Sequence, residues 1–321
     1  MAETPTLKSS RQQASGSSSA EATRASRVAC GLAMLSHRGR VRHANQDACA
    51  ALPELGAFVV CDGIGGAAAG EVASRLATEA FLHALSRPVQ QTTRRTSLKA
   101  VSEAAKAALG SRAGEQTASE DGRAIYSADH PHSRLREAVR AANQAVFRHS
   151  RKSPSLRGMG TTLVAALWDG PDTALLWLAH VGDSRCYRLR HGTLQRLTED
   201  HSLVEEQVRA GTLSRVEAAV SPIRNIITRA VGSGPVVEPE IAAHAALPGD
   251  VYLLATDGLT RELDDAGIGR ILTEFLPRTA TATTQNKGQN ARLEPACHAL
   301  IEAANAQGGR DNITVLLIGC P

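Results

Sequence analysis

The sequence predicts an α+β fold in which helices cover antiparallel sheets. Short apolar runs recur along much of the 321-residue chain, and several neighbours are separated by links of only a few residues. Such links join antiparallel strands, because parallel strands need a longer crossover. The stretches with helical periodicity fall in separate blocks and do not alternate with the strands. This arrangement favours a layered α+β fold and disfavours a doubly wound parallel sheet.

Each predicted element follows from its apolar pattern. The strand-like runs are residues 29–35, 48–52, 57–61, 161–168, 174–181, 185–189, 193–197, 251–255 and 312–318. The links at 169–172, 182–184 and 191–192 predict a β-meander over 161–197. Helical periodicity predicts helices at 70–85, 135–149, 202–210, 264–276 and 291–306.

The chain divides into a tail and one large domain. Residues 1–27 are rich in Ser, Ala, Thr and Arg and lack an apolar period, which predicts a disordered N-terminal tail. An organelle transit peptide has a similar composition. Residues 28–321 contain enough apolar residues for a substantial core. Within them, two polar stretches at about 87–132 and 278–290 are interpreted as surface insertions.

Composition excludes several classes of protein. The formal net charge of +4 includes no sustained Lys/Arg block, so we expect no dedicated nucleic-acid surface. No apolar stretch approaches the length of a membrane span, and no signal-peptide region is present. The chain is therefore expected to be cytoplasmic with no membrane segment. A monomer is the default expectation, since the sequence does not indicate an oligomeric state. Its cysteines have no C-x-x-C spacing and read as unpaired apolar residues in a reducing compartment, and they are Cys30, Cys49, Cys61, Cys186, Cys297 and Cys320.

Four aspartates border apolar strands: Asp47, Asp62, Asp257 and Asp311. If the strand ends meet, these carboxylates repel one another and must take up protons or cations. Oxygen ligands favour Mg²⁺ or Mn²⁺, and a pair of such ions can bind a phosphoryl group and ionise a water. The set therefore indicates a hydrolase of phosphate esters. For any single Asp-Gly pair the alternative is a turn, since Gly accepts positive φ.

Eight motifs occur in a recognisable order. They are Arg40-Val-Arg42-x-x-Asn-Gln-Asp47, Asp62-Gly-Ile-Gly-Gly66, Gly158-Met-Gly-Thr-Thr162, His180-Val-Gly-Asp-Ser-Arg185, Leu197-Thr-x-Asp-His-Ser-Leu203, Asn225-x-x-Thr-Arg-Ala-Val-Gly232, Thr256-Asp-Gly258 and Gly309-Arg-Asp-Asn312. Over residues 28–319 this series resembles the metal-dependent protein serine/threonine phosphatases of the PP2C type, particularly the compact bacterial members. The resemblance implies a four-layer αββα sandwich, with two central antiparallel sheets flanked by helices and a two-metal site at one end.

The resemblance also implies the metal ligands. Two Mn²⁺ or Mg²⁺ ions are expected, with Asp62 bridging both and the backbone carbonyl of Gly63 on one of them. Asp257 and Asp311 would complete the other ion. Asp47 would act mainly through metal-bound water and orient the nucleophile.

Two further residues are candidates. Arg42 stands five residues before Asp47, where the family has its phosphate-binding arginine, and its planar fork suits a phosphate dianion. The alternative is a solvated turn arginine. Asp183 resembles the ligand of a third, weaker ion in bacterial relatives; the alternative is a turn carboxylate paired with Arg185. The segment at about 199–234 resembles the family's flap over the active site.

The implied activity is hydrolysis of phosphoserine and phosphothreonine by a water activated between the two ions. The expected partners are phosphorylated proteins, among them a serine/threonine kinase and its substrates in a bacterium. A non-catalytic binding module would be expected to lose a metal-ligating aspartate, and a nuclease would be expected to carry a basic, aromatic groove. Neither pattern is present.

The chain departs from the family's pattern at two positions. Ala67 replaces the histidine of a Gly-Gly-His loop; if that histidine is a general acid in relatives, its loss costs up to roughly 100- to 10,000-fold in rate. A metal-bound water or His43 is the expected substitute. Gln46 stands where many members have Glu, which predicts weaker metal binding.

Overall fold

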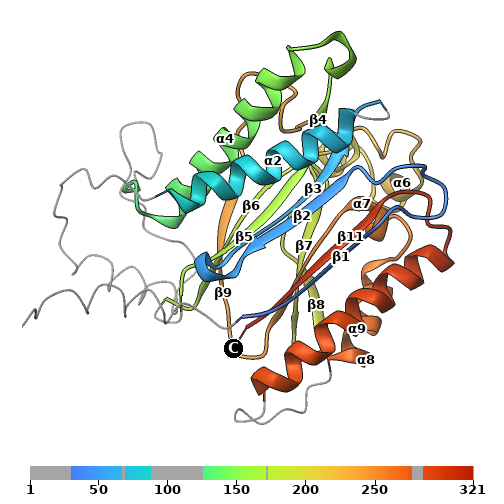
Figure 1. Cartoon of the computed structure of the whole chain (residues 1–321). Coiled ribbons are helices and arrows are strands. Elements are labelled where there is room, and N and C mark those ends of the chain that lie inside the picture. Colours follow the sequence, from blue (N-terminus) through green and yellow to red (C-terminus); the bar gives the residue numbers. More distant parts are fainter. Residues whose placement is uncertain (1–29, 67–68, 88–125, 171–172, 277–284, 321) are drawn as a thin grey trace, which may run out of the picture.

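The computed structural model describes residues 30–66, 69–87, 126–170, 173–276 and 285–320. Two antiparallel sheets pack face to face, and helices cover both outer faces (Figure 1). The predicted four-layer αββα sandwich is therefore confirmed. The predicted tail, Ala67 and most of the predicted insertion at 87–132 lie outside the described residues.

In the first sheet, the strand nearest the C-terminus lies in the interior. The strands in spatial order are β1 (Gly31–His37), β11 (Ile313–Gly319), β10 (Val251–Ala255), β7 (Arg185–Arg190) and β8 (Thr193–Arg196). All neighbours pair antiparallel, with Gly31 opposite Gly319 and Val251 opposite the same residue on the other side. Every residue of β11 is buried, because the strand has a neighbour on each edge and a layer on each face.

The second sheet carries the other half of the sandwich. Its main path is β2 (Asp47–Leu52), β3 (Ala57–Ile64), β5 (Leu163–Trp168), β6 (Leu175–Val181) and β9 (Glu240–Ala245). A two-residue strand, β4 (Gly160–Thr161), pairs with the end of β3. The edge strand β9 was not predicted, since its residues are mostly half-buried or exposed and show no apolar run.

The predicted meander over 161–197 is wrong in one respect. β6 and β7 follow each other closely but lie in different sheets, so the link Gly182–Ser184 crosses from one layer to the other. Gly182 has φ of 102°, and a Cβ there would lie 2.7 Å from Cγ2 of Thr162. Facing sheets are only about 10 Å apart, so a short link can reach either a neighbouring strand or the facing sheet. Link length alone does not distinguish the two.

Helices form the outer layers. α2 (Ala69–Ser86) and α4 (Pro131–Ser150) cover the second sheet, and α8 (Asp265–Phe275) and α9 (Gln285–Ala306) cover the first (Figure 1). A third apolar cluster, which includes Phe58, Tyr252 and Leu316, fills the space between the sheets. The shorter helices are α5 (Leu203–Arg209), α6 (Arg215–Val220), α7 (Asp257–Thr260) and the 3-10 turns Pro53–Leu55 and Pro154–Leu156.

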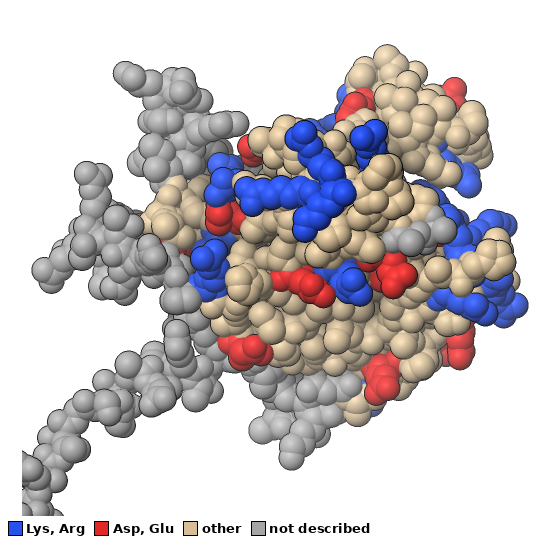
Figure 2. All heavy atoms as spheres, turned by 45° about the horizontal axis from the view of Figure 1, so that its top comes forward, with Lys and Arg blue, Asp and Glu red and all other residues tan. Residues whose placement is uncertain are grey.

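The structure can be compared with the predictions made from composition about membrane spans, cysteines and surface charge. No helix among the described residues has both the length and the apolar character needed to cross a bilayer. The six cysteines are free thiols, four of them buried. Figure 2 shows Lys and Arg side chains gathered on parts of one face, with Asp and Glu between them.

Candidate metal and phosphate site

Four strands bring the predicted aspartates to one end of the sandwich. Asp47 begins β2 and faces Asp62 of β3 across the ladder, while Asp257 follows β10 and Asp311 precedes β11. A pocket of about 320 Å³ is lined by Asp62, Asp257 and Asp311, and also by Asp183 from the link between the sheets. Asp47 is not among the lining residues. The predicted convergence is therefore observed for the pocket carboxylates, with Asp47 beside them.

The two Asp-Gly pairs are not turns. Neither Gly63, in β3, nor Gly258, in α7, has positive φ. A Cβ at Gly63 would lie 2.2 Å from the carbonyl oxygen of Gly70, and a Cβ at Gly258 would lie 1.9 Å from that of Asn312. Each glycine is thus required by close approach of another backbone segment. The turn interpretation is wrong for both pairs.

Asp47 is held by two threonines that sequence reasoning missed. Its Oδ2 accepts hydrogen bonds from Thr256 Oγ1 at 2.9 Å and Thr314 Oγ1 at 2.6 Å. Its Oδ1 is buried and has no hydrogen-bond partner among the described residues. Burial raises the pKa of Asp47 to about 7, although the threonine hydrogen bonds act in the opposite direction. The only signal in the sequence is that each threonine lies close to a predicted aspartate.

Asp257 is buried and Asp62 is half-buried, and the one ion pair that either forms among the described residues is that of Asp257 with Arg261. Burial raises the pKa of both carboxyls well above the ordinary value, and the charges of Asp47 on Asp62 and of Asp183 on Asp257 add to the effect. Oδ1 of Asp257 is buried without a hydrogen-bond partner among the described residues. Such carboxylates gain most from a bound cation, and a set made only of oxygens suits Mg²⁺ or Mn²⁺. The residues present therefore fit the predicted divalent cations.

Two arginines reach the carboxylates. Arg42 Nη2 lies 2.7 Å from Asp311 Oδ2, and 51% of the Arg42 side chain is exposed at the pocket rim. Arg261, which was not predicted, contacts Asp257 and lies 3.5 Å from Asp183 Oδ2. It stands one helical turn after Asp257, so the i, i+4 spacing after a predicted metal-ligating aspartate is the signal that could have found it.

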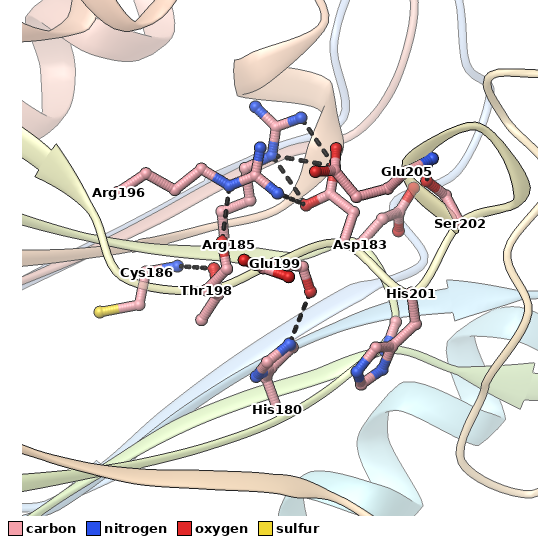
Figure 3. A network of polar contacts seen from close by, with 12 residues as sticks. His180, Asp183, Arg185, Cys186, Arg196, Thr198, Glu199, His201, Ser202 and Glu205 are labelled. Atoms are coloured by element: carbon pink, nitrogen blue, oxygen red, sulfur yellow. Dashed lines mark hydrogen bonds and ion pairs between the residues drawn. The ribbon is translucent and has the colours of Figure 1, made fainter. Parts of the chain in front are cut away.

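Asp183 is not paired with Arg185. The Arg185 guanidinium binds Asp200 instead, with Nε and Nη2 at 3.0 and 2.7 Å from its carboxylate oxygens, and Arg196 Nη2 binds the same carboxylate at 2.8 Å. In Figure 3 these two arginines converge beside Asp183. The alternative interpretation of Asp183 as a partner of Arg185 is therefore wrong, and Arg261 is its ion-pair partner among the described residues.

The loop that carries Arg42 is fixed by Asn312. The Asn312 amide donates to the carbonyls of Arg38 and Ala44 at 3.0 and 2.9 Å, and its oxygen accepts from the Gln46 backbone N–H at 2.8 Å. Gln46 lines the pocket. His43, the proposed substitute proton donor, is exposed and is not among the described residues that line the pocket.

Part of the pocket wall comes from the segment 199–234. It contains α5 and α6, and it contributes Asn225 and Ile227 to the lining. One isolated bridge, Thr161 with Val231, ties it to the body, and a second, Ser202 with Ile227, joins two parts of the segment itself. Asn225 belongs to a motif that sequence analysis quoted without giving it a role.

Comparison with known proteins agrees with this geometry. A family model described as protein phosphatase 2C matches residues 36–294. The serine/threonine phosphatase stp of Listeria welshimeri is 32% identical over 290 residues, which cover 88% of this chain and 92% of that protein. The serine/threonine protein phosphatase PstP of Mycobacterium tuberculosis is 34% identical over 282 residues, which cover 88% of this chain but 43% of PstP.

Solved structures show the same likeness. The crystal structure of M. tuberculosis PstP has a TM-score of 0.67 and 32% identity, covering 91% of this chain and 98% of that one. The PstP catalytic domain in complex with two manganese ions has a TM-score of 0.63 and 32% identity, covering 90% and 97%. With its carboxylate pocket at the same end of an αββα sandwich as Arg42, the chain belongs to the protein phosphatase 2C family of metal-dependent phosphoprotein phosphatases.

Proposed function

We propose that this chain hydrolyses phosphoserine and phosphothreonine in proteins, with Asp62, Gly63, Asp257 and Asp311 holding two divalent cations. The observation that carries the proposal is that three buried or half-buried aspartates from separate strands line one pocket, with Arg42 at its rim. Two divalent cations, when bound, neutralise phosphoryl oxygens and acidify water. The names of the relatives, which describe serine/threonine phosphatases, support the substrate class.

Each side chain then has a separate task. Asp62 would hold both cations, the carbonyl oxygen of its neighbour Gly63 would contribute to one of them, and Asp257 and Asp311 would hold the other. Asp183 would be the ligand of any third ion. Asp47 Oδ1 accepts no hydrogen bond among the described residues, because both threonine hydrogen bonds go to Oδ2, so Oδ1 is the atom that would orient a water beside the pocket.

Arg42 is proposed to bind the substrate phosphate. Its guanidinium binds Asp311 with one nitrogen, Nη2, and is half exposed at the rim. A phosphoryl group in the pocket gives the planar fork a second anion, and a bidentate contact of this kind orients the phosphorus. The segment 199–234 is proposed to act as a flap, since its residues Asn225 and Ile227 line the same pocket.

The direct test is metal-dependent phosphate release. The purified protein should release phosphate from phosphoserine and phosphothreonine peptides with Mn²⁺ or Mg²⁺, and Asp257→Asn should abolish release while leaving the fold intact by circular dichroism. Parallel reactions with nucleic acid should yield no product. Inactivity with both metals would favour the non-catalytic alternative, and cleavage of nucleic acid would favour a nuclease.

The departure at Ala67 has its own test. A nitrophenolate leaving group needs no proton, so the ratio of activity on nitrophenyl phosphate to activity on a phosphopeptide should exceed that of a relative with histidine at this position. Equal ratios for this chain and for such a relative, measured under the same conditions, would show that Ala67 does not cost the chain a proton donor.

A serine/threonine kinase is the proposed functional partner. Hydrolysis of phosphoserine and phosphothreonine reverses the product of such a kinase, so deletion of this chain should raise phosphorylation on the kinase and on its substrates. Quantitative phosphoproteomics with an Asp257→Asn complementation control identifies those proteins. An unchanged phosphoproteome would separate the catalytic activity from this signalling role.

A further inference from the structure

Arg261 occupies a central place among the carboxylates. Its Nη2 lies 3.5 Å from Asp183 Oδ2 and contacts Asp257, and its Nη1 lies 3.8 Å from Asp311 Oδ2. Only 30% of its side chain is exposed, compared with 51% for Arg42. Its guanidinium thus faces three candidate metal ligands from inside the site.

The backbone fixes Arg261 in this position. It follows the last residue of α7, and its N–H donates to the Asp257 carbonyl at 2.8 Å. The side chains at i and i+4 lie on the same face of a helix, so Arg261 must point the same way as Asp257. The other nearby arginine, Arg185, is committed to Asp200 through three hydrogen bonds. Asp183 therefore depends on Arg261 for its counter-charge among the described residues.

Arg261 also stands between two cavities. The pocket of about 320 Å³ and a second one of about 680 Å³, which runs beside α5 and α6, share Asp183, Asn225, Asp257 and Arg261 in their linings. A hydrated ion could approach Asp183 through either cavity. The guanidinium lies where that approach reaches the Asp183 carboxylate.

We propose that the guanidinium of Arg261 takes the place of a third metal ion. It supplies the positive charge that Asp183 and Asp257 would otherwise obtain from that ion. The inference rests on the proposed two-cation site and adds a positioning residue to it. A unit positive charge a few ångströms away repels an incoming cation strongly, even at the effective dielectric constant of a protein surface. The wild-type chain should therefore hold two ions and resist a third.

The test counts bound Mn²⁺ by equilibrium dialysis and atomic absorption, a readout independent of turnover. Wild type and Arg261→Lys should bind two ions per chain over the titrated range. Arg261→Gln removes the charge while keeping a long polar side chain, and it should bind a third ion about tenfold or more tightly than wild type does. Adding Asp183→Asn to Arg261→Gln should remove that third ion. Arg270→Gln, an exposed arginine on α8, is the matched control and should bind two.

The outcomes separate this inference from the proposed function. If wild type binds no Mn²⁺, the two-cation site itself is wrong. If wild type binds two ions and Arg261→Gln gives the same isotherm, only the role of Arg261 is overturned. A third ion that survives Asp183→Asn would also overturn it. Circular dichroism and thermal unfolding of every metal-free variant establish that the proteins are folded before dialysis.

Discussion

Strand β10 has a buried aspartate just beyond each of its ends, and the two ends differ. Asp250, before the strand, is bonded by Arg190 Nε at 2.8 Å and by the Leu247 N–H at 2.8 Å. Asp257, after the strand, contacts Arg261 through Oδ2 but leaves Oδ1 buried with no hydrogen bond among the described residues, and it lies in a cluster of like charges. The same side chain is thus satisfied at one end and left in need of a cation at the other.

The difference separates structural from functional carboxylates. A buried charge that is paired and hydrogen-bonded is satisfied within the fold, and removing its partner is costly. A buried charge with unfilled lone pairs is stabilised when a cation binds. Asp62 of β3 lines the same pocket as Asp257, so substitutions at this pocket end of the sandwich and at Asp250 should have opposite effects on activity and on stability.

The largest expected effect is on catalysis. Asp62→Asn removes the carboxylate proposed to bridge both cations and should lower kcat/KM by about 1,000-fold or more, the range for loss of a principal electrostatic group. Asp250→Asn, at the far end, should leave kcat/KM within about twofold. The measurement is steady-state phosphate release with Mn²⁺. Comparable losses in both variants would show that the two ends do not differ in function.

Removal of the metal should lower the free energy of unfolding, and this effect should depend on the aspartates of the pocket and not on Asp250. Mn²⁺ at a hundred times its dissociation constant should stabilise the wild-type fold by about 2.7 kcal/mol per site, because the cation binds the folded chain. The gain should be much reduced in Asp62→Asn and unchanged in Asp250→Asn. Urea unfolding with Mn²⁺ or with EDTA measures it. A full gain in Asp62→Asn would place the cations elsewhere.

At the structural end, loss of the ion pair should destabilise the fold. Asp250→Asn should lower the free energy of unfolding by about 2 kcal/mol, below the full cost of breaking a buried pair because the Arg190 side chain is 23% exposed. Metal-free Asp62→Asn should be at least as stable as wild type, since it removes an uncompensated buried charge. Urea unfolding in EDTA tests both variants, and equal destabilisation would contradict the comparison.

A pH dependence of the stability of the metal-free protein is also expected. The folded-state pKa of Asp47 is about 7, above its unfolded value, so the folded chain binds the proton more tightly. Its contribution to stability is full below about pH 4 and is lost as pH rises through 7. The free energy of unfolding should fall by up to about 1.4 kcal/mol per pH unit from this group. Urea titrations in EDTA should show a shallower slope for Asp47→Asn, while Asp250→Asn keeps the wild-type slope.

Local patterns predicted most of the strands and the helical layers. The run 251–255 is predicted and observed with the same bounds, because a buried strand shows its apolar character in sequence. The division of strands between sheets was not predictable, since the link at 182–184 has the length of a hairpin turn. The edge strand Glu240–Ala245 has too few buried residues to form a pattern.

The convergence of the aspartates was predictable, and the network of contacts around them was not. Asp62, Asp257 and Asp311 each lie in a short motif that can be recognised in a single sequence. Their supporting contacts join residues distant along the chain, such as Thr314 with Asp47 or Arg42 with Asp311, and nothing local marks such partners. The same limit explains why the sequence suggested Arg185, which is close to Asp183 along the chain, as its ion-pair partner. In the structure the partner of Asp183 is Arg261.

The interior position of β11 determines when the pocket can form as the chain is synthesised. β11 is inserted between β1 and β10, and residues at its start provide Asp311, the Asn312 clasp on the Arg42 loop and the Thr314 bond to Asp47. A ribosome makes β1 first and β11 nearly 300 residues later, with Gly31 finally pairing with Gly319. The emerging chain can bury much of its second sheet early, yet it has no complete pocket until this strand docks. Catalytic competence is therefore expected to appear only after β11 has been synthesised and has docked, as a single late step of folding.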